Sequence, residues 1–231
     1  MENAKIKTLA ESFRATVPVM FGYIPIGIAF GLLVTRYGFH WTDAVLMSIL
    51  IYSAAGQFLA IALIIAGAGM LEIVLTMLFL NLRHSFFGLS LLTKFSDIKS
   101  ARPYLIFGLT DETYALITAS NVPEELPKSW FYTFVTGLNH LYWITGTFLG
   151  ALLGQSLEVN LNGLEFSLTA LFVVLSIEQY HSSKNRYPFV VALVAGGLAL
   201  AFVGAKNMLL VSIIIGTLIL LAYEEVQKNA Q

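Results

Sequence analysis

The stretch MLEIVLTMLFLNLRHSFFGLSLLT, residues 70–93, decides the class of this protein. It is a hydrophobic run long enough to span a bilayer, with Asn81, Arg83 and His84 near its centre. A guanidinium stays charged at any ordinary pH, and its insertion at the middle of a spanning helix costs about 3 kcal/mol or more unless it faces a cavity or a partner. The run predicts a membrane helix with a polar centre, which is typical of proteins that handle a charged or zwitterionic solute.

The composition of the whole chain supports a membrane protein. The 231 residues are 57% hydrophobic and 12% charged, whereas soluble domains are about a quarter charged. Four stretches without Asp, Glu, Lys or Arg are each long enough to cross about 30 Å of hydrocarbon as a helix: 15–35, 44–71, 129–157 and 187–205. A net charge of −1 without basic clusters argues against nucleic-acid binding, and the absence of cysteine excludes disulfides and thiolate metal sites.

These patterns predict an all-α, polytopic integral membrane protein in which residues 1–231 form one transmembrane domain of six to eight membrane segments. The expected apolar segments are 15–35, 43–67, 70–93, 103–119, 129–154, 166–180, 187–205 and 207–223.

Two pairs of segments share a pattern that indicates an internal repeat. Tyr23, Gly27 and Gly31 form Y-x-x-x-G-x-x-x-G, and the same motif recurs 119 residues later at Tyr142, Gly146 and Gly150. Gln57-Phe58 and Gln179-Tyr180 are similarly placed, 122 residues apart. We expect repeats at about 10–119 and 129–223. The alternative is chance, since small residues at this spacing commonly mediate helix packing, within the chain or with a partner.

The distribution of basic residues tests the layout of the segments, because cytoplasmic loops are enriched in Lys and Arg. If all eight segments cross from a cytoplasmic N-terminus, seven basic residues lie inside and five outside. If segments 43–67 and 166–180 are re-entrant, nine lie inside and three outside. The nine are Lys5, Lys7, Arg14, Lys94, Lys99, Arg102, Lys184, Arg186 and Lys228, and the three are Arg36, Lys128 and Lys206. This bias favours two broken or re-entrant segments and an inverted second repeat. A layout with an external N-terminus and seven crossings stays open.

The first candidate site is a break in the membrane helix at residues 52–57. Gly56 frees the backbone, and Gln57 can bond to stranded backbone groups. Half-helix ends would offer N–H groups to a carboxylate and carbonyl groups to an ammonium, which suits a zwitterion. The competing interpretation is an intact helix in which Gln57 bonds to a neighbour.

The second candidate joins two polar clusters. Asn81 and His84 share a helix face, and Arg83 either binds a substrate carboxylate or pairs with Asp111 or Glu112. Adjacent carboxylates point to different faces of a helix, so the unpaired one would be desolvated and available for protonation, as a proton-coupled carrier requires. Alternatively, the two acids lie at a helix end near water.

The third candidate cluster contains Asn139, His140, Tyr142 and Trp143. Asn139 and Tyr142 share one face and could line the wall around an apolar substrate side chain. The alternative is an interfacial aromatic belt. The chain contains no H-E-x-x-H, G-x-S-x-G or Walker motif, so we expect neither catalysis nor a cofactor nor a metal.

At these positions the chain resembles the AzlC family of branched-chain amino acid exporters. The resemblance covers about residues 8–222. Its motifs are Phe13-Arg14 with Pro18 and Gly22, Pro25 with Phe30-Gly31, Ala55-Gly56-Gln57-Phe58, Asn81-Leu82-Arg83-His84, Asp111-Glu112-Thr113-Tyr114, and Asn139-His140 with Tyr142-Trp143. It implies the large subunit of a two-component exporter, which works with a small AzlD-type membrane subunit. The implied substrates are valine, leucine, isoleucine or analogues.

Together, the residues and the resemblance predict a secondary, proton-linked exporter of hydrophobic amino acids in the cytoplasmic (inner) membrane. Two other classes stay open. A channel or solute-binding membrane protein would share the buried polar clusters without ion coupling, and a membrane-embedded enzyme would need a catalytic pair, for which only Asp111 and His84 offer themselves.

Overall fold

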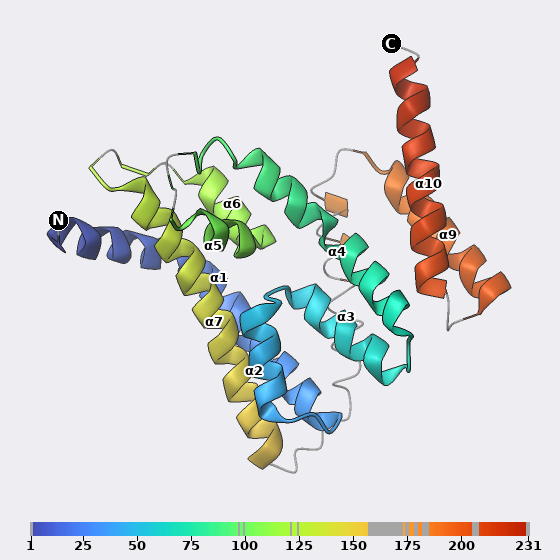
Figure 1. The fold of residues 1–231 in the computed structure, drawn as a ribbon, viewed down its shortest axis with the longest axis horizontal. Coiled ribbons are helices and arrows are strands. Elements are labelled where there is room, and N and C mark those ends of the chain that lie inside the picture. Colours follow the sequence, from blue (N-terminus) through green and yellow to red (C-terminus); the bar gives the residue numbers. More distant parts are fainter. Residues whose placement is uncertain are drawn as a thin grey trace. The chain divides into compact units, whose positions relative to one another are not determined.

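The computed structural model describes residues 2–96, 98, 100–120, 122–123, 125–156, 173, 176–177, 180–181, 185–204 and 208–229. In this part of the chain all regular structure is helical (Figure 1). The helices are α1 (Glu2–Arg36), α2 (Trp41–Leu50), α3 (Ala54–Ile65), α4 (Met70–Ser90), α5 (Arg102–Phe107), α6 (Asp111–Ala119), α7 (Lys128–Ser156), α9 (Tyr187–Val203) and α10 (Met208–Asn229). The predicted all-α class is confirmed.

The chain forms two compact units. Unit 1 comprises Met1–Phe58 and Asn81–Leu164, and unit 2 comprises Leu59–Leu80 and Glu165–Gln231. Unit 1 therefore holds α1, α2, the start of α3, the second half of α4, and α5 to α7. In unit 2, α9 and α10 pack antiparallel, with the Tyr187 ring stacked on Tyr223 at 4.2 Å. Most of the predicted segment 166–180, including Gln179, lies outside the described residues.

The centre of unit 1 is a pair of parallel helices, α1 and α7 (Figure 1). The Ser12 hydroxyl donates to the Phe131 carbonyl at 3.4 Å, Gly27 faces Gly146, and further along Gly31 faces Gly150. At these three points a residue of α1 meets the residue of α7 that lies 119 positions later. The two Y-x-x-x-G-x-x-x-G motifs pack against each other, in register and within the chain.

The direction of α7 corrects the predicted inverted repeat. In an inverted repeat, the helices that carry matching motifs run antiparallel in the membrane. Here Ser12 lies near Phe131, and Thr35 lies near Gly154, so α1 and α7 run the same way. The expected inversion of the segment that begins near 129 is therefore wrong for these two helices.

The predicted segment 43–67 is divided at Ile51–Ser53 into α2 and α3. Along α2, Trp41 packs on Phe148, and Ser48 donates to Thr147 at 2.8 Å. Beyond the end of α2, the Tyr52 ring lies against His140. The partners on α7 thus come earlier in the chain as α2 proceeds, so α2 runs antiparallel to α7. The chain then turns back, so that α2 and the start of α3 form a first hairpin. Trp143 donates to Gln57, and Phe58 packs on Phe30 of α1, at the level where Gly31 meets Gly150. The break at Ile51–Ser53 overlaps the start of the predicted residues 52–57, but the left-handed residue is Tyr52 and not Gly56, which lies inside α3.

The predicted segment 103–119 is divided in the same way, into α5 and α6, by residues 108–110. Tyr104 on α5 contacts His140, and Thr113 on α6 contacts Asn139, so both helices reach the middle of α7. Ile117 then returns to the start of α7. This segment is a second hairpin and not one spanning helix, which is a correction of the sequence-based layout.

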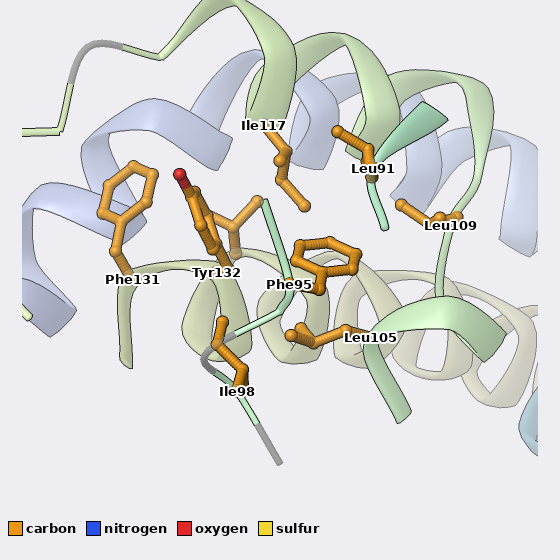
Figure 2. Packing of buried hydrophobic residues seen from close by; sticks show 9 residues of the cluster. Leu91, Phe95, Ile98, Leu105, Leu109, Ile117, Phe131 and Tyr132 are labelled. Atoms are coloured by element: carbon orange, nitrogen blue, oxygen red, sulfur yellow. The ribbon is translucent and has the colours of Figure 1, made fainter. Parts of the chain in front are cut away.

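A hydrophobic cluster fixes the outer end of this second hairpin (Figure 2). Figure 2 shows Phe95 between Ile117 of α6 and Leu105 of α5. The buried members of the cluster are Leu91, Phe95, Ile98, Leu105, Leu109, Ile117, Phe131, Tyr132 and Val135. Because they come from the segment that follows α4, the second hairpin and the first turns of α7, the cluster sets the depth to which the hairpin reaches.

Two described helices are long and apolar enough to cross a membrane, Ala4–Arg36 and Met70–Ser90. Shorter apolar helices occur at Trp41–Leu50, Ala54–Ile65, Tyr187–Val203 and Val211–Tyr223. The number of crossings therefore stays a prediction.

The contact between α1 and α7 should tolerate no added methyl group at its centre. A Cβ at Gly150 would overlap the backbone of Ile28, whereas a Cβ at Gly22 meets nothing within 4 Å. We expect Gly150→Ala to lower the free energy of unfolding by about 1–3 kcal/mol, as overpacking does. Gly22→Ala, on α1 and outside the contact, should be neutral or slightly stabilising. Thermal unfolding of the two variants in detergent measures the difference, and equal stability would contradict the proposed close contact.

Candidate functional site

The tips of the two hairpins meet beside His140 of α7. The Tyr52 ring lies 4.2 Å from the His140 ring and 6.3 Å from Phe107, between centroids. His140 Nδ1 lies 3.2 Å from the Tyr104 hydroxyl, and Nε2 lies 3.2 Å from the Ser48 carbonyl oxygen. One imidazole therefore bonds to an element of each hairpin, and the interrupted backbone is held by α7.

Tyr52 is the strained residue of this meeting point. Its φ of 45° is uncommon for a residue with a bulky side chain, because the left-handed region brings Cβ close to the backbone. The residue is only 3% exposed, and its hydroxyl makes no hydrogen bond. Strain and an unpaired buried hydroxyl at the same residue are features of a functional site rather than of a stability element.

A second group of polar residues surrounds the start of α6. The Tyr23 hydroxyl of α1 donates to the Glu112 carboxylate at 2.6 Å and lies 2.7 Å from the Thr110 hydroxyl. Thr110 caps α6 by accepting the Thr113 backbone N–H. Asn139 Nδ2 donates to Thr113 Oγ1 at 3.0 Å, but Asn139 Oδ1 is buried without a partner.

Gln57 takes part in a third, fully satisfied chain of hydrogen bonds. Trp143 Nε1 donates to Gln57 Oε1 at 2.8 Å, and Gln57 Nε2 donates to Ser48 Oγ at 3.1 Å. Ser48 Oγ in turn donates to Thr147 Oγ1 at 2.8 Å. All four side chains are buried, so this chain joins α2, α3 and α7 and holds the first hairpin in place.

The first turn of α3 forms a fourth contact, with α4. Ser53 Oγ donates to Asn81 Oδ1 at 2.9 Å. A Cβ at Gly56 would lie 2.8 Å from Ser53 Oγ and 3.6 Å from Asn81 Nδ2, so glycine leaves room for both side chains. The first amides of α3 have no intrahelical acceptor, which makes this end electropositive.

Comparison with known proteins identifies the family to which this arrangement belongs. A family profile described as "AzlC protein" matches residues 18–157, which contain both hairpins and α7. The chain belongs to the AzlC family.

Several relatives of this AzlC-family chain are similar over most of its length. A Bacillus subtilis protein named branched-chain amino acid transport protein AzlC is 36% identical, over 83% of this chain and 74% of its own. A Helicobacter pylori protein described as an uncharacterized membrane protein is 34% identical, over 95% and 96%. The inner membrane protein YgaZ of Escherichia coli is 31% identical, over 83% and 80%. No solved structure matches the chain.

The structure brings some of the predicted site residues of this AzlC-family chain together and separates others. Glu112 and Asn139 lie around the start of α6, whereas Gly56 and Asn81 lie at the start of α3. The Tyr142 hydroxyl lies 3.1 Å from the Thr16 hydroxyl of α1, and the wall that Tyr142 is expected to share with Asn139 stays a prediction.

The remaining predicted residues lie beside these groups. The His84 ring is 5.9 Å from Phe87 on the same helix, and Asp111 opens α6 next to Glu112. Arg83 lies on α4, but its side chain is outside the described features, so its pairing with Asp111 or Glu112 stays a prediction. Among the described residues, no group of three or more His, Asp or Glu is placed to hold a metal ion.

The sequence-based reasoning missed Tyr52 as the strained residue, and it missed Tyr23, Thr110 and Thr113. The alternative that places the two acids at a helix end is the one the structure shows, and Thr110-Asp111-Glu112 has the pattern of a helix start, with a capping residue followed by acids. This pattern, two residues after Gly108, could have indicated the second break. Nothing in the sequence pairs Tyr23 with Glu112, which is 89 residues away.

Two tyrosine-to-phenylalanine variants test the hydrogen-bond assignment of the site. Tyr52→Phe removes a hydroxyl that has no partner, so its free energy of unfolding should stay within about 0.5 kcal/mol of the native value. Tyr23→Phe deprives Glu112 and Thr110 of a partner and should cost about 1 kcal/mol or more. Chemical unfolding in detergent compares the two. A larger loss for Tyr52→Phe would show that its hydroxyl is bonded.

Proposed function

We propose that this chain is the large subunit of a secondary exporter of branched-chain amino acids, such as valine, leucine, isoleucine or analogues, in the cytoplasmic membrane. The main support for the proposal is that two apolar segments are each broken into a hairpin, and that the tips of these hairpins meet at the buried polar residues around His140. Irregular backbone at membrane depth is tolerated where protein or a water-filled cavity satisfies it, and transporters place substrate sites there. Membership of the AzlC family and the name of the Bacillus subtilis relative, a branched-chain amino acid transport protein, support the substrate class.

The proposed membrane layout has α1, α4 and α7 crossing, with one hairpin entering from each side. The ends of α1 and α7 that carry Ser12 and Phe131 then lie on one side, together with the start of α5 and the end of α6. Among the described residues of unit 1 outside α4, six basic residues fall on that side, and one, Arg36, on the other. The six are Lys5, Lys7, Arg14, Lys94, Arg102 and Lys128. By the positive-inside rule that side is cytoplasmic.

In this proposal the substrate carboxylate binds at the first turn of α3. The amides there, the Asn81 side chain and the Arg83 guanidinium offer donors, and a guanidinium can bind a carboxylate through two hydrogen bonds. Arg83 would alternate between the substrate and an internal acid, Asp111 or Glu112. This alternation would link the occupancy of the site to the gating of the hairpins.

The energy source in the proposal is a proton gradient, with the acidic pair at the start of α6 as the protonatable group. A small AzlD-type membrane subunit would complete the exporter. A channel or a solute-binding membrane protein would show no coupling and no exchange, so counterflow separates these classes from a carrier.

Counterflow also tests the role of Arg83. We expect proteoliposomes that hold the chain with its small subunit to exchange labelled leucine or valine for internal substrate. Arg83→Ala should abolish this exchange, since a missing charged partner for a carboxylate costs about 2 kcal/mol or more. Arg36→Ala, at the exposed end of α1, should exchange normally. Full activity of a folded Arg83→Ala protein would refute the proposed site, and linear leak in place of exchange would indicate a channel.

Cysteine labelling tests the layout directly, because the chain has no native cysteine. With a membrane-impermeant maleimide, we expect Ser96→Cys and Glu125→Cys to react from the cytoplasmic side and Tyr37→Cys from the outside. The first two flank the second hairpin. Labelling of Ser96→Cys and Glu125→Cys from opposite sides would show that residues 103–119 cross the membrane after all.

A further inference from the structure

Two buried oxygen atoms without hydrogen-bond partners lie at the start of α6. Asn139 Oδ1 belongs to a residue with no exposed surface, and the Tyr52 hydroxyl to one that is 3% exposed. Both approach Thr113. Asn139 Nδ2 donates to Thr113 Oγ1, and the Tyr52 hydroxyl lies close to Thr113 and Tyr23 without hydrogen-bonding geometry to either. Leaving such atoms unpaired costs about 1–3 kcal/mol each, so their position needs a reason.

The chemistry of the surrounding groups indicates what could pair with these oxygens. Glu112 is one residue before Thr113, and its carboxylate accepts a hydrogen bond from Tyr23 at 2.6 Å. It is exposed, so the group has an open side. A carboxylate, an amide oxygen and a phenol oxygen are all acceptors. A ligand with several donors and a positive charge satisfies all three, and an ammonium group has three donors and no acceptor.

We propose that Glu112, Asn139 and Tyr52 form a subsite for the primary ammonium group of an amine. Resting on the proposed function, this is the α-ammonium group of the transported amino acid. The acidic residues at the start of α6 repel a carboxylate, whereas the first turn of α3 attracts one. Tyr52 lies two residues before α3 begins, so it borders both ends of the zwitterion. The strained backbone of Tyr52 holds its hydroxyl between the two.

Substrate analogues that lack one charged group test this assignment. Leucinol keeps the ammonium and lacks the carboxylate, whereas 4-methylpentanoate keeps the carboxylate and lacks the ammonium. In counterflow of labelled leucine, both should inhibit the native exporter. Tyr52→Phe and Glu112→Gln should each raise the leucinol concentration for half inhibition by about ten-fold or more, the effect of one lost hydrogen bond to a charged group. Inhibition by 4-methylpentanoate should stay within about two-fold.

Matched controls separate a local effect from a general one. Tyr132→Phe removes a phenol hydroxyl in the hydrophobic cluster, and Glu125→Gln neutralises an exposed acid between α6 and α7. Leucine counterflow by both control variants should be inhibited by either analogue at the same concentration as counterflow by the native protein. If Tyr52→Phe and Glu112→Gln weaken inhibition by leucinol and by 4-methylpentanoate equally, the subsite is wrong. It is also wrong if neither variant changes inhibition by leucinol.

A binding assay keeps the test independent of transport. Trp143 is buried, and its ring lies 5.7 Å from that of Tyr23, so it should report occupancy of the subsite by fluorescence. With Trp41 and Trp130 replaced by phenylalanine, leucinol should change the emission of the full chain with its small subunit, and Glu112→Gln should weaken this response about ten-fold or more. A response in the absence of leucine exchange would refute the proposed function and retain the amine site. A response to sodium ions in place of leucinol would overturn the ammonium assignment.

Discussion

The direct contact of two helix backbones at Gly31 and Gly150 is the constraint on which the rest of unit 1 depends. Because no side chain separates α1 from α7 there, the two parallel helices are held in one register. In a bilayer, the lipid is as apolar as the helix surface, so close packing of this kind replaces the hydrophobic effect as the force that joins helices. Both hairpins are then bonded to faces of this pair, through His140, Trp143 and Thr147 on α7 and Tyr23 on α1.

The hairpins are possible because the pair supplies polar partners at the depth where their backbones are interrupted. The carbonyl of Ser48 near the end of α2 accepts from His140, and Thr110 caps α6 while it contacts Tyr23. Unpaired backbone groups in an apolar medium cost several kcal/mol each, so these contacts offset the cost of the two breaks. The polar side chains of α1 and α7 therefore shape the site even where they do not contact a substrate.

The all-helical membrane class and the break near Tyr52 follow from local features of the sequence, namely long uncharged runs and the small residues Ser53, Ala54, Ala55 and Gly56. The direction of α7 does not follow from its motif, since the same small-residue spacing permits parallel and antiparallel packing. The charge count favours inversion only if residues 103–119 cross the membrane, and an apolar run of that length has the same composition whether it crosses or turns back. Most of the candidate residues do lie near the hairpin tips, but the partnership of Tyr23 with Glu112 depends on tertiary structure alone.

The single ring proton of neutral His140 determines how the imidazole bonds to both hairpins. A carbonyl oxygen can only accept, so the nitrogen facing Ser48 carries the hydrogen, and in the neutral ring the other nitrogen accepts from Tyr104. A second proton on the ring would deprive the Tyr104 hydroxyl of its acceptor, and withdrawal of α2 would leave the imidazole N–H bare. The two hairpins thus share the His140 ring as a hydrogen-bond partner. A movement of either hairpin away from α7 breaks one of the two hydrogen bonds of this ring.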